Sequence, residues 1–293
     1  MTTSADAGAP APARLQARAY TVPSRLAAAL LLGASRASLV AILVLVLVAT
    51  DPPVTPPVLA RLVALLAVVP GILAWLIEKA ARADVEVRDA ELVVRHRRVR
   101  LEVPCSAIAG VVPWALPLPG PGASLRMRSG RRLRYGIEVA DPTPLLAALA
   151  GAGVTAAHAA IQHPTVVYAH ARAHGTSWRW YHLLGKFVLF ALLPTALLFN
   201  AHQHIAYGAL LGEYYQLGLA SYLATFAIYW ATLSTYLLLY ASAWRGLAEG
   251  VALAAARVAP SRAARVRRAV ETWCRIVYYA GVPVLLLIRF LPW

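Results

Sequence analysis

Long apolar runs separated by polar stretches dominate the hydrophobic pattern of the chain. Five of these runs approach the roughly 20 residues that an α-helix needs to cross a bilayer. They cover residues 30–49, 58–77, 183–201, 217–243 and 273–291. The pattern therefore predicts an α-helical multi-pass membrane protein with five spans. Proline within three of them, at Pro70, Pro194 and Pro283, is expected to kink the helices.

The stretch between the second and third spans follows a different period. Apolar residues such as Val99, Leu101 and Val103 alternate with charged ones, which is typical of antiparallel strands with one buried face and one wet face. After the strands, Thr143–Gly151 predicts a short helix with Thr143 as its N-cap and Gly151 as its C-cap. We therefore expect a small cytosolic β-rich domain with a C-terminal helix over residues 83–152, inserted between spans two and three.

The other segments follow from composition. A tail rich in Ala, Pro, Ser and Thr is expected to be disordered, and a transmembrane hairpin follows it. Histidines gather in a juxtamembrane segment before the last three spans, and a basic loop is expected inside that three-span domain. These segments are residues 1–25 (tail), 26–78 (hairpin), 153–181 (His-rich), 182–293 (three-span domain) and 245–271 (basic cytosolic loop).

Three features of the β-rich insert resemble a known family. They are Val85-Glu86-Val87-Arg88-Asp89 before Leu92-Val93-Val94, the passage from Leu101 to Ile108, and the closing Asp-Pro-Thr-Pro-Leu-Leu-Ala-Ala-Leu helix. The insert resembles the bacterial pleckstrin-homology-like (PH-like) domains of multi-pass membrane proteins. The resemblance implies a strongly bent sheet capped by a helix, and it implies no catalytic residues.

The charge distribution indicates an orientation. The chain has 293 residues, is 60% hydrophobic and carries a formal net charge of +15. Basic residues number 3, 0, 14, 0 and 6 in the successive segments outside the spans. By the positive-inside rule this alternation predicts a cytosolic N-terminus and an outer C-terminus. The resemblance to bacterial domains implies residence in a bacterial inner membrane. The excess of positive charge is then a topology signal, and we expect no nucleic-acid partner.

Arginines line the wet faces of the predicted strands. Anionic lipid headgroups attract such residues by about 1 kcal/mol each close to the surface. The alternative is a solvated face that topology keeps in the cytosol. The candidate headgroup contacts are Arg95, Arg97, Arg98, Arg100, Arg126, Arg128, Arg131, Arg132 and Arg134.

Polar residues also converge on the predicted outer layer of the membrane. Ionisable residues at membrane depth suggest function. Near the ends of spans, however, they can equally snorkel or form one structural ion pair of Glu213 with Arg61 or Arg289. The candidate cluster is Arg61, His202, His204, Glu213 and Arg289. Three further basic residues, Arg36, Lys186 and Arg275, lie toward the inner ends of spans.

Two weaker patterns complete the candidates. His170 and His174 have a spacing that can bind a metal on one helix face, but with no carboxylate or cysteine nearby in sequence we expect no metal. Small residues form a helix-packing seam on the fourth span. The seam consists of Ala220, Ala224, Ala227, Ala231, Ser234 and Ala241.

The sequence contains no nucleotide-binding, hydrolase or zinc-protease motif, so we expect no cofactor and assign no catalytic residue. The leading hypothesis is a scaffold, assembly or regulatory protein of the bacterial inner membrane with a basic PH-like docking domain. Its expected partners are the bilayer, anionic headgroups, and a membrane protein or a second copy. The alternatives are a membrane enzyme or small-molecule carrier that uses the outer cluster, and haem or metal binding at the histidines.

Overall fold

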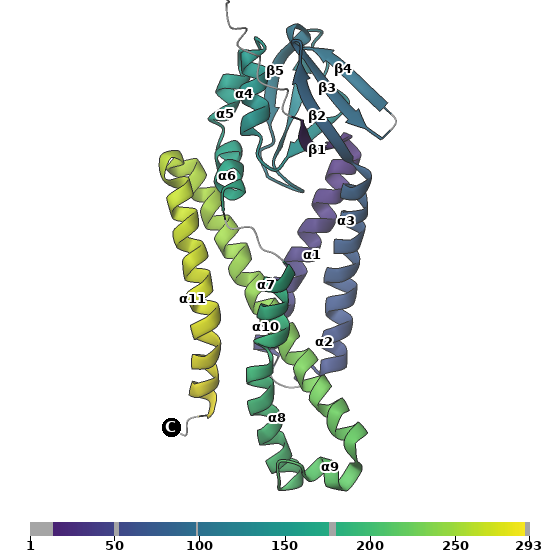
Figure 1. Ribbon diagram of the computed structural model, residues 1–293, viewed down its shortest axis with the longest axis vertical. Helices are drawn as coiled ribbons and strands as arrows, with labels where there is room; N and C mark the ends of the chain where they lie inside the picture. The colour runs from purple at the N-terminus through teal and green to yellow at the C-terminus, as the bar shows by residue number, and fades with distance from the viewer. Residues whose placement is uncertain (1–13, 50–52, 98, 176–179, 291–293) are drawn as a thin grey trace, which may run out of the picture. The chain divides into compact units, whose positions relative to one another are not determined.

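The computed structural model describes residues 14–49, 53–97, 99–175 and 180–290, with side chains to residue 284 (Figure 1). The chain forms two compact units. One comprises the described parts of 1–32, 72–174 and 255–264, and the other those of 33–71, 175–254 and 265–293. The first holds a curled antiparallel sheet, and the second consists of helices.

Seven strands form the sheet, in the order β4-β3-β2-β1-β7-β6-β5, and every neighbouring pair is antiparallel. Alternate residues such as Val85 and Val94 pair across β2 and β3 and are fully buried. The alternating pattern thus correctly predicted strands within residues 83–139, but it did not predict the strand Leu15–Tyr20. The strands are β1 (Leu15–Tyr20), β2 (Arg82–Arg88), β3 (Glu91–His96), β4 (Val99–Pro104), β5 (Ile108–Pro113), β6 (Gly122–Met127) and β7 (Gly136–Val139), with a 3₁₀ turn η2 (Cys105–Ala107) before β5.

The prediction of a disordered tail through residue 25 is wrong for the described part, residues 14–25. Strand β1 lies in the middle of the sheet, where it pairs with β2 on one side and β7 on the other. It buries Ala17, Ala19 and Tyr20, and two sets of ladder hydrogen bonds satisfy its backbone. The sheet is therefore not an insert between spans; instead, the helical hairpin from Val22 to Ala80 is inserted between its first two strands.

Three short helices pack on the sheet: α4 (Thr143–Gly151), α5 (Ala156–Ile161) and α6 (Pro164–Ala173). They bury Leu146, Leu149 and Val166 against the strands. The predicted bounds of α4 are confirmed, but its caps lie one residue further out, at Pro142 and Ala152. Asp141 instead supplies the side chain that accepts the Thr143 N–H, at 3.0 Å. We call the sheet with α4–α6 the sheet domain.

Four helical stretches are long and apolar enough to cross a membrane: Val22–Val48, Pro56–Ala80, Trp180–Tyr207 and Leu219–Val258. Large apolar side chains on them face outward, for example Leu30 at 72% exposure. This is what lipid-facing helices require, so the chain has the character of a membrane protein. The four stretches are α1 (Val22–Val48), α2 (Pro56–Leu62) with η1 (Val63–Val68) and α3 (Val69–Ala80), α7 (Trp180–Leu184) with η3 (Gly185–Leu189) and α8 (Leu192–Tyr207), and α10 (Leu219–Val258).

Two of these stretches contain a π-helical turn on the N-terminal side of a proline. The turn η1 ends two residues before Pro70, and η3 ends five residues before Pro194. Proline has no N–H to donate to the preceding turn, and π-helical turns are one way in which a helix accommodates such a break. Pro70 and Pro194 therefore lie close to irregular turns, whereas Pro283 lies inside the continuous helix Ala263–Phe290. The kinks expected at the three prolines stay a prediction.

The predicted basic loop 245–271 is wrong. Helix α10 continues through Val258, and after a 3₁₀ turn η4 (Pro260–Arg262) the chain enters α11 (Ala263–Phe290). Alanine-rich sequence after Trp244 favours helix, while its charges had suggested a loop. With 40 residues, α10 is about 60 Å long, twice the hydrocarbon thickness of a bilayer. The predicted fifth span falls within α11, which is not among the four apolar stretches of the described residues.

Candidate functional site

Among the described side chains of the predicted outer cluster, that of Glu213 is the most buried. The residue lies in α9 (Gly212–Leu217) with 2% of its surface exposed. Its carboxylate accepts hydrogen bonds from Gln203 Nε2 at 2.7 Å, Ser221 Oγ at 2.9 Å and Thr225 Oγ1 at 2.6 Å. Its backbone N–H donates to Gln203 Oε1 at 3.2 Å. One carboxylate thus joins the end of α8 to the start of α10.

The surroundings of Glu213 favour its ionised form. Burial raises its pKa, but hydrogen bonds from Thr225, Gln203 and Ser221 and the nearby His202 lower it further, so that the net pKa is below the ordinary value. Gly208 and Gly218 end the helices on either side with positive φ angles of 76° and 86°, which favour glycine. This arrangement builds a tight outer turn.

Among the described side chains, the other predicted members of the cluster take no part in the hydrogen bonds of Glu213. His202 packs its ring against Tyr229 and Tyr207, at centroid distances of 5.3 and 6.0 Å. His204 and Arg61 are exposed, and no ion pair to Glu213 occurs among the residues the structure describes. The side chain of Arg289 lies outside the described residues.

A second candidate site is the end of the sheet from which the helices leave. Strand β1 ends at Tyr20, just before α1, and β2 begins at Arg82, just after α3. The register places the β3–β4 turn at this end, because His96 pairs with Ala83. Only the last residues of the β6–β7 connection reach it, because Gly136 pairs with Tyr20. Arg128, earlier in that connection, donates its N–H to the Ala107 carbonyl, two residues after Cys105, whose N–H donates to Ala90 in the β2–β3 turn at the opposite end. We call the end from which the helices leave the helix end of the sheet.

Among the candidate arginines that the structure describes, Arg97 makes its contact at the helix end, and five others lie close together in sequence. Arg97 sits in the β3–β4 turn, where its Nε donates to the carbonyl of Ala80, the last residue of α3, at 3.1 Å. The segment from Arg126 to Arg134, which we call the arginine loop, carries five arginines and no acidic residue. All five arginines are exposed. They are Arg126, Arg128, Arg131, Arg132 and Arg134.

The two sets of candidate arginines differ in whether a carboxylate lies nearby. Arg95 lies 4.0 Å from Glu86, and Arg100 lies 2.5 Å from Glu102, so local carboxylates offset this set. Within the described part of the chain, no ion pair to an arginine-loop residue is found. Arg98 lies outside the described residues. The arginine loop is therefore the uncompensated positive surface of the sheet domain.

Sequence reasoning missed a buried ionic group at the root of the helical hairpin. Arg18 of β1 forms ion pairs with Glu138 of β7 and, at 3.3 Å, with Glu78 of α3. Arg25 of α1 lays its guanidinium over the Trp114 ring, 3.8 Å from the centroid. These contacts fix the sheet to the first turns of α1 and the last turns of α3. Only the long-range pairing of β1 could have revealed them.

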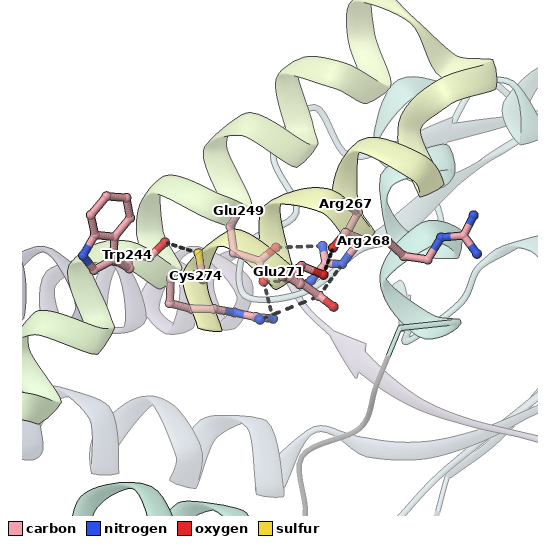
Figure 2. A network of polar contacts seen from close by, with 8 residues as sticks. Trp244, Glu249, Arg267, Arg268, Glu271 and Cys274 are labelled. Carbon is pink, nitrogen blue, oxygen red and sulfur yellow. Dashed lines mark hydrogen bonds and ion pairs between the residues drawn. The ribbon is translucent and has the colours of Figure 1, made fainter. Parts of the chain in front are cut away.

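A larger network joins α10 to α11 (Figure 2). Arg267 has a side chain only 5% exposed and forks onto Glu249, with Nη1–Oε2 at 3.0 Å and Nη2–Oε1 at 3.1 Å. Its Nε donates to Glu271 at 3.0 Å, and Arg245 pairs with Glu249 at 2.5 Å. The i,i+4 spacings of Arg245 with Glu249 and of Arg267 with Glu271 were the sequence signal for this network.

The inner basic residues and the cysteines lie in the helical unit or in the sheet core. Lys186 places its Nζ 3.9 Å from the centroid of the Tyr278 ring, and the Tyr278 hydroxyl donates to the Lys186 carbonyl at 2.9 Å. Arg36 and Arg275 are exposed on their helices. Cys105 is buried in the sheet domain, and Cys274 contacts the Trp244 carbonyl through its sulfur at 3.6 Å.

Only the C-terminal part of the small-residue seam of α10 packs within the described chain, where Ala241 lies against the cluster of Ala191, Leu237 and Tyr278. Ala220, Ala224, Ala227 and Ala231 are exposed, and Ser234 and Ala241 are half-buried. The packed face instead surrounds Phe199 of α8 with three rings of α10, at centroid distances of 4.9 to 6.0 Å. Those rings belong to Tyr222, Phe226 and Tyr229.

The two histidines of the weak metal candidate acquire a carboxylate neighbour in the fold. His170 Nδ1 lies 2.9 Å from Asp141 Oδ2, although the residues are 29 positions apart. Burial raises the pKa of Asp141, but hydrogen bonds from Thr143 and His170 lower it further, and the net pKa is below the ordinary value. The expectation that no carboxylate accompanies these histidines is therefore wrong.

No protein-family model, no curated protein and no solved structure matches the chain.

Proposed function

We propose that this chain is a scaffold or regulatory protein of the bacterial inner membrane, with a PH-like sheet domain that docks on anionic surface at that membrane. The observation that carries the proposal is the arginine loop: five exposed arginines to which no ion pair is found in the described part of the chain.

The connection to the helices keeps the helix end of the sheet near the headgroups. Helix α3 ends at Ala80, three residues after the predicted second span, and α1 begins eight residues before the predicted first span. At 1.5 Å per residue these intervals are about 4.5 and 12 Å. Both are comparable to the screening length of about 8–10 Å at physiological salt. The helix end, where Arg97 contacts the last residue of α3, is therefore within electrostatic reach of the headgroup layer in the proposed topology.

The attraction between the arginine loop and an anionic leaflet is large enough to contribute to docking. Each basic residue near an anionic leaflet contributes about 1 kcal/mol. The helical hairpin is covalently joined to the sheet domain, so docking is intramolecular and needs no further loss of translational freedom. Several arginines together can then fix how the domain faces the membrane, while α4–α6 and the outer sheet edge remain available to a protein partner. Five spans with a cytosolic N-terminus complete the proposed topology.

Replacing Arg128, Arg131 and Arg132 by Gln in the full-length chain tests the proposal. A charge-matched control replaces three exposed arginines elsewhere, Arg88, Arg262 and Arg265, by Gln. We expect only the loop variant to lose complementation of a deletion strain and to lose the proteins that copurify with the wild type in mild detergent. Equal behaviour of the two variants, or full activity of the loop variant at wild-type abundance, contradicts the proposal.

A further inference from the structure

The neighbourhood of α6 brings two imidazoles and one carboxylate together. Asp141 lies just before α4, and His170 and His174 lie on the last turn of α6 and at its C-cap. The three residues each offer a ligand atom, and these atoms lie within 4.8 Å of one another. Donors around a tetrahedral zinc ion, each about 2 Å from the metal, are roughly 3.3 Å apart. Small side-chain rotations therefore suffice to bring the three donors onto one ion.

Hydrogen bonds already orient these donors. The Oδ1 atom of Asp141 accepts the Thr143 N–H at 3.0 Å, which leaves Oδ2 directed at His170. The His174 Nδ1 lies 2.9 Å from the His170 carbonyl, and a proton on that Nδ1 leaves Nε2 with its lone pair. A backbone carbonyl holding one ring nitrogen while the other binds metal is the usual outer support of a histidine ligand. The two rings stand 4.3 Å apart between centroids.

The remaining histidines of the segment separate this cluster from a merely His-rich surface. His163 uses its Nδ1 for Thr165, at 2.7 Å from the hydroxyl, and serves as the N-cap of α6. His158 is exposed on α5 and belongs to no cluster of three potential ligands among the described residues. Only His170 and His174 combine helical spacing with a carboxylate.

We propose that Asp141, His170 and His174 form a binding site for a divalent metal ion of the zinc class. The ion takes the place of the hydrogen bond between His170 Nδ1 and Asp141 Oδ2 and binds His174 through Nε2. Three protein donors of this kind leave one position for water, and nitrogen and oxygen donors without thiolate suit zinc, nickel or cobalt. Because the site joins the start of α4 to the end of α6, bound metal should stabilise the helical cap of the sheet domain.

Titration of zinc chloride into the full-length protein, purified in detergent without a polyhistidine tag, tests the site. We expect one equivalent of zinc to bind to the wild type and to raise its melting temperature in proportion to the logarithm of zinc concentration. His170→Ala and His174→Ala should each weaken binding by at least 100-fold, and Asp141→Asn by at least 10-fold. The matched control, His158→Ala, should leave binding unchanged.

Asp141 also caps α4, so Asp141→Asn can lower stability without metal; the exposed His174→Gln variant keeps the test independent of folding. Circular dichroism of each zinc-free variant identifies any loss of fold. The proposal is overturned if 100 µM zinc produces no binding to the wild type. It is equally overturned if the folded His170 and His174 variants bind zinc as tightly as His158→Ala.

Discussion

Substitution of Arg267 provides the sharpest test of how α10 and α11 are held together. The side chain is 5% exposed and makes three charge-assisted hydrogen bonds, at 3.0, 3.0 and 3.1 Å. Arg267→Ala removes all three. It leaves Glu249 and Glu271, whose side chains are 24% and 17% exposed, beside the half-exposed Arg245. Breaking a buried ion pair by removing one partner costs about 3–5 kcal/mol.

The two carboxylates retain some water and one arginine, so we expect the lower part of that range, about 3 kcal/mol. For a unit of 150–250 residues this corresponds to roughly 6–12 °C in melting temperature. The assay is thermal unfolding of the full-length protein in detergent, together with amide hydrogen exchange over the α10–α11 hairpin. Adding Glu249→Gln to Arg267→Ala should restore part of the loss, because it removes one unpaired charge, and the double-mutant cycle should give a coupling of about 1–3 kcal/mol.

Arg268 provides the matched control, since it is adjacent in sequence but exposed. The Thr272 hydroxyl donates a hydrogen bond to its backbone carbonyl, and its side chain takes part in no hydrogen bond among the described residues. Arg268→Ala should change stability by no more than about 0.5 kcal/mol. If Arg267→Ala were no more destabilising than Arg268→Ala, or if the cycle showed no coupling, the reasoning about the buried network would be refuted.

Two further predictions concern other buried positions. Glu213→Gln places an amide N–H₂ against a hydroxyl donor or the Gln203 amide and should cost about 1.5–3 kcal/mol in unfolding experiments. Because the pKa of Glu213 is lowered in the folded protein, the wild type should exceed Glu213→Gln in stability by the full amount well above pH 4.5. This difference in stability should shrink as the pH falls through the lowered pKa. A difference that does not change with pH down to 3 would contradict this. Ala19→Asp puts a charge into the centre of the sheet, at a position that is 4% exposed, and should abolish the protection of β2 and β7 amides from hydrogen exchange. The control Gln16→Asp, on the exposed side of β1, should leave this protection in place. Similar protection in the two variants would show that β1 is not a central strand.

The parts of the fold that the sequence predicted are those with a clear local pattern. Strands β2 to β4 alternate with a clear period of two, and the bounds of α4 follow from the Asp-Pro-Thr-Pro start and Gly151 at its end. Strand β1 has no such signal, because it is six residues long, contains two alanines, and pairs with residues more than 60 positions away. Its place in the sheet depends on those distant ladders.

The candidate sites likewise divide into features that are visible along the chain and features that only the fold brings together. The arginine loop and the His170–His174 spacing are visible along the chain. Asp141 reaches His170 only through the packing of α4 and α6, and Glu213 finds Ser221 and Thr225 only because the α8–α10 turn closes. Charges after Trp244 suggested a loop, whereas the alanine-rich composition and two i,i+4 ion pairs favour the continuous helices that form.

Hydrogen exchange of the arginine loop in lipid nanodiscs tests the central claim most directly. The full-length protein is compared in phosphatidylcholine alone and in phosphatidylcholine with 30% phosphatidylglycerol, at low and high salt. Docking on anionic headgroups predicts that amides of residues 126–134 exchange at least several-fold more slowly in the anionic discs. The protection should vanish at high salt and in the Arg128→Gln, Arg131→Gln, Arg132→Gln variant. Identical exchange of this segment in both lipid compositions at low salt would contradict the account.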